Sequence, residues 1–125
     1  MTVLIDSWAW VEYWKGGKDA PKAAEQIEGT EEAVVSSLNV AEVYFWVSKH
    51  YGEEMASRKS ATLMRRCHII VPDGDLAISA AKLKAAHGLG LAESFVLASA
   101  RVSHAKIVTG DPDLKKFDDV IFIGS

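Results

Sequence analysis

Residues 2–8 read TVLIDSW, an apolar run that ends on an aspartate. Val3–Ile5 is rich in β-branched residues and does not alternate with polar ones, which indicates a strand covered on both faces. Asp6 follows this strand directly, and Ser7 begins a helical pattern. An aspartate at this position either caps the helix or belongs to a site at the end of the strand. The choice depends on whether other acids point to the same place.

Similar apolar runs recur along the chain and predict five strands: Val3–Ile5, Ala33–Val35, His68–Val71, Lys106–Val108 and Val120–Ile123. Helical patterns lie between them, at Ser7–Lys15, Pro21–Glu28, Leu38–Tyr51, Glu53–Arg66, Asp75–His87 and Leu91–His104, with a turn around Asp113–Phe117. Strands that alternate with helices predict a three-layer α/β/α sandwich with a central, mostly parallel sheet. No repeat or linker-like segment interrupts residues 1–125, so we expect a single domain.

The composition limits the classes of function. A net charge of −3 over 125 residues argues against binding nucleic acid through overall positive charge. No apolar stretch approaches the roughly 20 residues that span a bilayer, and no basic segment precedes Val3–Ile5 as in a signal peptide. The single cysteine, Cys67, cannot form an internal disulfide, which fits a reducing compartment. We therefore expect a cytoplasmic protein that makes no membrane contact.

Two acids lie near the ends of predicted strands. Asp6 follows the first strand, and Asp111 follows Lys106–Val108 in the segment IVTGDPDL, which also contains Asp113. In open parallel sheets, ligands bind beyond the carboxyl ends of the strands, where the strand order reverses. Taken singly, Asp111 and Asp113 are also typical turn residues.

Two glutamates lie on helical faces that are otherwise apolar. Glu42 lies three and four residues before Phe45 and Trp46, and Glu93 lies three residues before Val96. These spacings bring side chains to the same face of a helix, and we expect both faces to pack on the core. A buried carboxylate without a partner is costly. Each glutamate therefore either meets a basic side chain or joins a site with other acids.

If the four acids converge, their charges repel one another. Two unit charges about 4 Å apart cost about 4 kcal/mol at an effective dielectric constant near 20, so the cluster needs a cation. A set of oxygen ligands favours Mg²⁺ or Mn²⁺ over zinc. Such a site suits phosphodiester hydrolysis, because the metal activates a water and neutralises the phosphate. The chain contains no GxxxxGK[S/T], GxGxxG or GxSxG motif, so nucleotide-binding loops and nucleophile-elbow hydrolases lack support.

The order of these segments resembles the PIN-domain ribonucleases, and among them the VapC toxins of toxin–antitoxin pairs. The resemblance covers nearly the whole chain and is carried by four segments in order: VLIDS, SSLNVAEVYF, HGLGLAESFVLASA and KIVTGDPDLKKF. It implies a PIN-like fold and a metal-dependent endoribonuclease that cleaves RNA with a metal-activated water. It also implies a cognate antitoxin partner and a homodimer.

The resemblance also implies roles for individual residues. The catalytic acids, which would bind Mg²⁺ or Mn²⁺, are Asp6, Glu42, Glu93 and Asp111, with Asp113 as a fifth metal ligand. Ser7 and Thr109 occupy positions whose hydroxyls support the acids by hydrogen bonding in similar proteins. The sequence departs from the family at Glu93, because the third acid is more often an aspartate.

Two alternatives stay open. In the first, Glu93 spoils the metal site and the chain is a catalytically silent PIN-like binding module. In the second, the chain is a receiver-like Mg²⁺ phospho-acceptor domain, which also clusters acids at strand ends. Against the second, Asp6 is not one of a pair, and the sequence ends in FIGS without a lysine after the last strand.

The sequence contains four tryptophans: Trp8, Trp10, Trp14 and Trp46. Tryptophan stacks on nucleobases, but it is also typical of cores and protein interfaces. Trp10 and Trp14 lie four residues apart, which favours a shared apolar face on the first helix.

Overall fold

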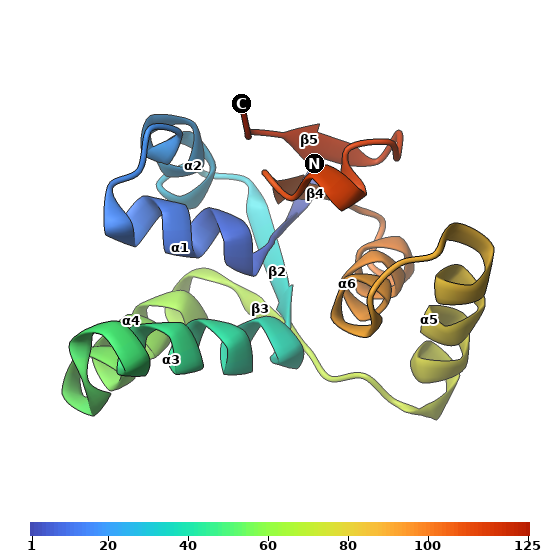
Figure 1. Ribbon diagram of the computed structural model, residues 1–125, viewed down its shortest axis with the longest axis horizontal. Helices are drawn as coiled ribbons and strands as arrows, with labels where there is room; N and C mark the ends of the chain where they lie inside the picture. Colours follow the sequence, from blue (N-terminus) through green and yellow to red (C-terminus); the bar gives the residue numbers. More distant parts are fainter.

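The computed structural model describes residues 1–125 and contains a five-stranded sheet in which every pair of neighbours is parallel (Figure 1). Its strands are β1 (Thr2–Ile5), β2 (Glu32–Ser36), β3 (His68–Ile70), β4 (Ala105–Thr109) and β5 (Val120–Phe122). They lie in the order β3-β2-β1-β4-β5. A receiver domain would have the order 2-1-3-4-5, so the observed order excludes the receiver-like alternative.

Six α-helices and one 3₁₀ helix connect the strands: α1 (Ser7–Lys15), α2 (Ala20–Ile27), α3 (Ser37–Tyr51), α4 (Glu53–Arg66), α5 (Gly74–His87), α6 (Leu91–Val102) and η1 (Pro112–Leu114). Glycine ends two of them: Gly16 after α1 and Gly88 after α5 have φ angles of 67° and 66°. This left-handed conformation is costly for residues with a Cβ atom. None of the helices combines the length and apolar character needed to cross a membrane.

The sheet separates two layers of the hydrophobic core. Val3, Leu4 and Ile5 of β1 are all completely buried. Val3 and Ile5 contact the cluster formed with α1–α4, whereas Leu4 contacts the cluster formed with α6. Helix α5 lies outside α6 and packs on it (Figure 1). Burial on both faces explains why β1 does not alternate, and the predicted three-layer α/β/α sandwich is confirmed.

The strand order reverses at β1, which places the ends of β1 and β4 side by side. β2 and β3 extend the sheet on one side of β1, and β4 and β5 extend it on the other. Ile5 pairs with Val108, and the backbone N–H of Asp6 donates to the Val108 carbonyl at 3.0 Å. Open α/β sheets bind ligands at such a reversal. Asp6 therefore lies where the fold favours a site.

Helix α3 contradicts one expectation. Its buried residues are Asn39, Val43 and Val47, whereas Glu42 is exposed and Phe45 is 67% exposed. The prediction that the face of Glu42 and Phe45 packs on the core was therefore wrong. Apolar residues occur on several sides of this helix, so their spacing alone does not select the side that meets the sheet.

Candidate functional site

Four acids from four parts of the chain line one pocket of about 200 Å³. Asp6 comes directly after β1, Glu42 lies on α3, Glu93 lies in the first turn of α6, and Asp111 precedes η1. The remaining wall is formed by Ser7, Trp8, Ala92, Val96 and Leu114. The structure thus brings the four acids proposed from the sequence into one concave site.

Asp6 accepts hydrogen bonds from two neutral side chains. Thr109 Oγ1 donates to its Oδ2 at 2.7 Å, and Asn39 Nδ2 donates to its Oδ1 at 3.2 Å. Its side chain makes no capping hydrogen bond to α1, although Asp6 occupies the N-cap position. The residue is only 8% exposed. The Asp6 carboxylate is therefore held at the C-terminal end of β1 by side chains from β4 and α3, and not by a capping bond to its own helix.

Asn39 is the site residue that the sequence motifs did not identify. Its Oδ1 accepts from the backbone N–H of Ser36 at 2.9 Å, which caps the start of α3. Its Nδ2 group donates to Asp6 and also to Ser7 Oγ, at 2.9 Å. Asn39 is completely buried. The signal was the spacing Ser36-x-x-Asn39 at the start of a helix, one turn before Glu42.

Ser7 and Thr109 connect acids through their hydroxyls. Ser7 Oγ accepts from Asn39 and donates to Glu42 Oε1 at 2.8 Å. Thr109 Oγ1 donates to Asp6 and accepts from the backbone N–H of Asp111 at 3.0 Å. Through these bonds, acids that follow β1 and β4 and an acid on α3 form one continuous network. Hydrogen bonds of this kind fix carboxylates in the orientation that a metal needs.

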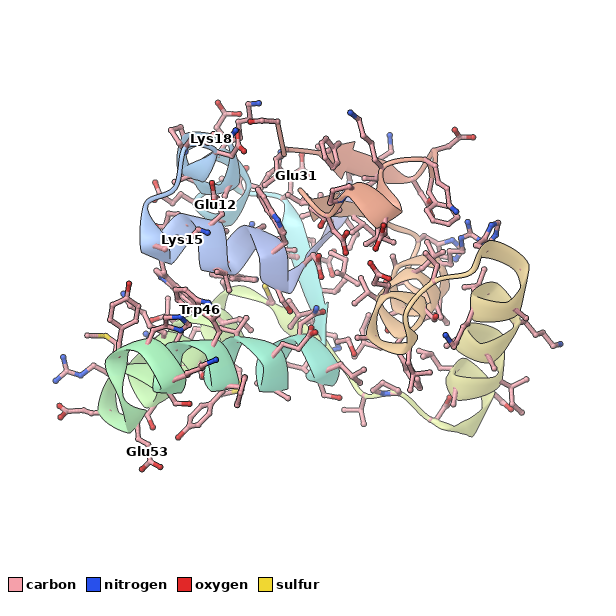
Figure 2. All side chains as sticks on the ribbon, in the orientation of Figure 1. Glu12, Lys15, Lys18, Glu31, Trp46 and Glu53 are labelled. Atoms are coloured by element: carbon pink, nitrogen blue, oxygen red, sulfur yellow. The ribbon has the colours of Figure 1, made fainter.

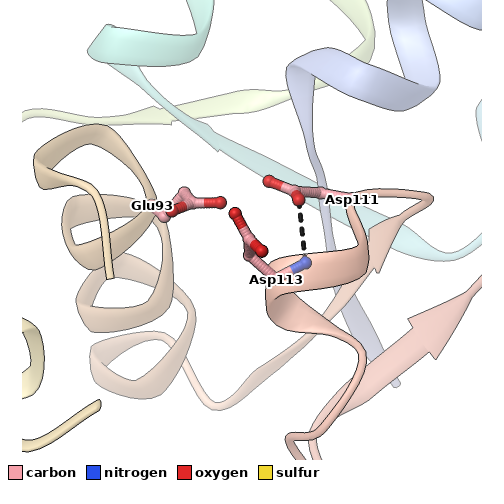
Figure 3. Close-up of side chains that lie close together, drawn as sticks. All are labelled: Glu93, Asp111 and Asp113. Atoms are coloured by element: carbon pink, nitrogen blue, oxygen red, sulfur yellow. Dashed lines mark hydrogen bonds between the residues drawn. The ribbon is translucent and has the colours of Figure 1, made fainter. Parts of the chain in front are cut away.

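Glu93, Asp111 and Asp113 form a triad of carboxylates that face one another. One oxygen from each lies within 4.8 Å of the others. Figure 3 shows the three side chains converging from α6 and from the loop and η1 that follow β4. Asp111 Oδ1 accepts from the backbone N–H of Asp113 at 2.9 Å, and this bond is drawn in the same view. No lysine or arginine forms an ion pair with any of the three.

Glu93 also caps its own helix. Its Oε1 accepts from the backbone N–H of Gly90 at 2.8 Å, and this bond satisfies one of the free amides at the start of α6. The glutamate thus combines a capping role with a place in the triad. A shorter aspartate at this position has less reach to the Gly90 amide.

Burial and neighbouring acids raise the pKa values of two carboxylates in the site. Burial raises the pKa of Asp6 to about 6, against the lowering effect of the Thr109 hydroxyl, and the charge of Glu42 raises it further. Contact with the Asp111 carboxylate, followed by burial, raises the pKa of Glu93 to about 7. A nearby cation would reverse both shifts, because it favours the ionised form.

The donor set fits a hard divalent cation. Every candidate ligand is a carboxylate oxygen, and neither histidine nor cysteine lines the pocket. Mg²⁺ and Mn²⁺ prefer such oxygen ligands. The triad of Glu93, Asp111 and Asp113 could hold one ion, and the carboxylates of Asp6 and Glu42 face the same pocket.

Solved structures of toxins have the same fold. The chain is similar to a protein in a toxin–antitoxin complex from Klebsiella pneumoniae, with a TM-score of 0.80 and 20% identity over 97% of each chain. It is similar to a chain of the DNA-bound VapBC2 complex of Rickettsia felis, with a TM-score of 0.74 and 19% identity over 98% of this chain and 97% of that one. It also resembles VapC20 of Mycobacterium tuberculosis, described as a sarcin–ricin-loop-cleaving toxin, with a TM-score of 0.75 and 15% identity over 94% and 98%.

The sequence itself matches a family model. A comparison with curated protein sequences gives no match. The model of the PIN domain, however, matches residues 3–120, which is nearly the whole chain and includes all the acids of the pocket. This chain therefore belongs to the PIN-domain family.

Proposed function

We propose that this protein is a metal-dependent endoribonuclease and the toxin of a toxin–antitoxin pair. The observation that carries the proposal is the convergence of Asp6, Glu42, Glu93 and Asp111 on one pocket at the reversal of strand order. Membership of the PIN-domain family and the shared fold with VapC toxins support the same conclusion.

The four acids would hold Mg²⁺ or Mn²⁺, with Asp113 as a fifth ligand. The raised pKa values support this proposal. Burial, with the charges of Glu42 and Asp111, raises the pKa of Asp6, and contact with Asp111 raises that of Glu93, so neither carboxylate has a counter-charge. When bound, the metal would activate a water for attack on the RNA phosphodiester and offset the charge of the phosphate. A local cation also allows a protein with a net charge of −3 to engage a polyanion.

The neutral side chains have a positioning role in this proposal. Asn39, Ser7 and Thr109 donate to the Asp6 and Glu42 carboxylates and so fix their orientation before the metal binds. A carboxylate that is already oriented loses less conformational entropy on binding an ion. A carboxylate of the pocket that keeps one oxygen free of the metal would accept the proton of the attacking water.

The proposed partners follow from the same resemblance. The toxin chains in the similar structures were solved in complexes with antitoxins or as VapC alone. We infer that this chain binds a cognate antitoxin, which would block the access of RNA to the acidic pocket. We also propose a homodimer, which rests only on the resemblance of the sequence to the family.

The test is the cleavage of a labelled single-stranded RNA by wild type and Asp6→Asn, each with Mg²⁺, Mn²⁺ or EDTA. Asp118→Asn is the matched control, because Asp118 is exposed and does not line the pocket. We expect wild type and Asp118→Asn to cut only when a metal is present, and Asp6→Asn not to cut while remaining folded.

Each other outcome has a defined meaning. Equal cutting by wild type and Asp6→Asn would refute the assignment of Asp6. If no protein cuts, calorimetry with Mn²⁺ separates two cases. Binding at millimolar Mn²⁺ would indicate an enzyme that was given the wrong RNA, whereas no binding would indicate the silent PIN-like module.

A further inference from the structure

A second groove, of about 400 Å³, adjoins the acidic pocket and runs between α1 and α3. The two cavities share Ser7, Trp8 and Glu42, so the groove begins where the acids lie. Beyond these shared residues its wall is formed by Val11, Glu12, Lys15, Phe45 and Trp46. The groove is therefore a direct continuation of the candidate active site.

Aromatic side chains line this groove on both sides. Phe45 lies one turn after Glu42 on α3 and is 67% exposed, so one of its ring faces is free to bind a flat partner. Trp46 is partly buried and stacks on His50, with ring centroids 4.4 Å apart. Trp8 lies directly on the backbone of Gly110, where an added Cβ would come within 2.4 Å of its ring. Trp8 and Trp46 are thus held by their neighbours, whereas Phe45 is uncovered.

One basic residue lines the groove. The Lys15 amino group lies 3.6 Å from Glu12 Oε1, and its side chain is half exposed. The Glu12 carboxylate is buried and also accepts from the backbone N–H of Asp19 at 2.9 Å. Figure 2 shows Lys15 at the end of α1, between Glu12 and Trp46, and Lys18 in the turn between α1 and α2, on the side away from α3. Lys15 is therefore half exposed at the end of the groove away from Asp6, and the buried Glu12 carboxylate offsets part of its positive charge.

We propose that this groove is a subsite for single-stranded RNA, in which a base next to the scissile phosphate stacks on Phe45 and a phosphate beyond it contacts Lys15. The proposal rests on the nuclease function proposed above. Aromatic faces together with a cation along a groove are typical of single-strand binding, because every base offers a π-face. Continuity with the acidic pocket favours RNA over a protein segment, because a strand held at its scissile phosphate must leave along an adjoining surface.

The first test separates stacking from general apolar contact. Affinity for a labelled single-stranded RNA is measured by fluorescence anisotropy in the Asp6→Asn background, which prevents cleavage. Phe45→Leu keeps the apolar bulk and removes the ring, whereas Phe45→Tyr keeps the ring. Phe45 also borders the groove between α3 and α4, which Tyr44 lines, but only Phe45 lines the groove beside the acids. Tyr44→Leu is therefore the matched control, because it changes the shared α3–α4 groove alone. We expect affinity to fall on the order of tenfold in Phe45→Leu and to change little in the other two.

The second test addresses the phosphate contact. Lys15→Met is compared with Lys18→Met, a change of the same kind at an exposed lysine outside the groove. We expect Lys15→Met to weaken binding for all RNA sequences and to lower the slope of log affinity against log salt by about one, whereas Lys18→Met leaves the slope unchanged.

The outcomes distinguish this inference from the nuclease proposal. If wild type cleaves RNA but Phe45→Leu and Phe45→Tyr bind it equally well, the stacking subsite is refuted and the nuclease stands. The same conclusion holds if Phe45→Leu weakens only the binding of a protein partner. If wild type neither binds nor cleaves any RNA and binds no Mn²⁺, both proposals fail together.

Discussion

The two sides of the acidic pocket are held in different ways. On the network side, the carboxylates of Asp6 and Glu42 receive hydrogen bonds from Asn39, Ser7 and Thr109. On the triad side, Glu93, Asp111 and Asp113 face one another, and the carboxylates of Glu93 and Asp111 each accept a hydrogen bond from one backbone amide. The network side therefore has its partners within the protein, whereas the triad side has carboxylates directed at other carboxylates.

This difference suggests a division of roles. Neutral donors orient an ionised carboxylate without cancelling its charge, so the network side keeps its geometry whether or not a metal is bound. Mutual repulsion on the triad side is relieved only by a proton or a cation. The high pKa of Glu93, about 7, is the expected result when neither a base nor a metal is near. We therefore expect changes to the neutral donors of the network side to affect folding, and changes to the triad side to affect metal binding with little effect on folding.

Asn39→Ala should have the largest effect on stability. It removes the acceptor for the Ser36 amide and the donor to Asp6 and Ser7, all at a completely buried position. We expect the free energy of unfolding in urea to fall by about 3 kcal/mol and cleavage to fall about 10- to 100-fold. Ser99→Ala is the control, because the Ser99 hydroxyl is buried without a hydrogen-bond partner. If both variants lost the same unfolding free energy, the hydrogen bonds of Asn39 would contribute no more than ordinary burial in the core.

Asp6→Asn should increase stability when no metal is present. The folded pKa of about 6 lies above the ordinary value of 3.8, so the folded state binds more protons than the unfolded state between these values. Wild type therefore loses stability as pH rises from about 4 through 6, by up to about 3 kcal/mol. The variant does not titrate there. Urea unfolding in EDTA should therefore show a difference in unfolding free energy between variant and wild type that grows from pH 4 to pH 8. A difference that stays constant with pH would contradict this prediction.

Thr109→Val should have an intermediate effect. The substitution keeps the shape but removes the donor to Asp6 and the acceptor for the Asp111 amide. We expect a loss of about 1–2 kcal/mol in unfolding free energy and a further rise in the pKa of Asp6, since the hydroxyl lowers it. Thr109→Ser should restore both. Failure of serine to restore them would show that the methyl group, and not the hydroxyl, is important.

Glu93→Gln should have the smallest effect on the metal-free protein. The amide side chain of this variant would retain an acceptor for the Gly90 amide while removing the charge that faces Asp111. In EDTA near pH 4, where the Glu93 carboxyl is protonated, we expect the unfolding free energy to change by less than about 0.5 kcal/mol. As pH rises through the Glu93 pKa of about 7, the variant should become more stable relative to wild type, because wild type loses stability as Glu93 ionises. We expect Mn²⁺ to raise the melting temperature of wild type and to raise that of Glu93→Gln much less, because a ligand that binds more tightly stabilises the folded state more. An undiminished rise would exclude Glu93 from the metal site.

The fold was largely predictable from the sequence. Helices Ser7–Lys15 and Glu53–Arg66 were predicted with the observed bounds, and every predicted strand lies within one residue of the observed one at each end. The reason is that the strands of this sheet are buried on both faces and so give short, clear apolar runs. The predicted end of α6 is two residues too late, because neither Ser103 nor His104 is a residue type that usually stops a helix.

The side-chain geometry was less predictable. Glu42 was expected on a core-facing stripe, but it is exposed, because α3 meets the sheet through Asn39, Val43 and Val47. Asn39 was overlooked because an amide inside a helix suggests neither catalysis nor metal binding. Its role depends on Asp6 and Ser7, which lie more than 30 residues away in sequence and become neighbours only when β1 and β2 pair.

The hydrogen bond from Thr109 to Asp6 joins residues 103 positions apart. This separation has a consequence for folding during synthesis. Synthesis proceeds from the N-terminus, and contacts between distant residues form late in folding. β1, β2 and β3 can assemble early, but the pocket is incomplete until β4 has been made and has docked against β1. A nascent chain thus lacks Thr109 and Asp111 for most of its synthesis. In this topology the order of synthesis delays the completed pocket until almost all of these residues have been translated.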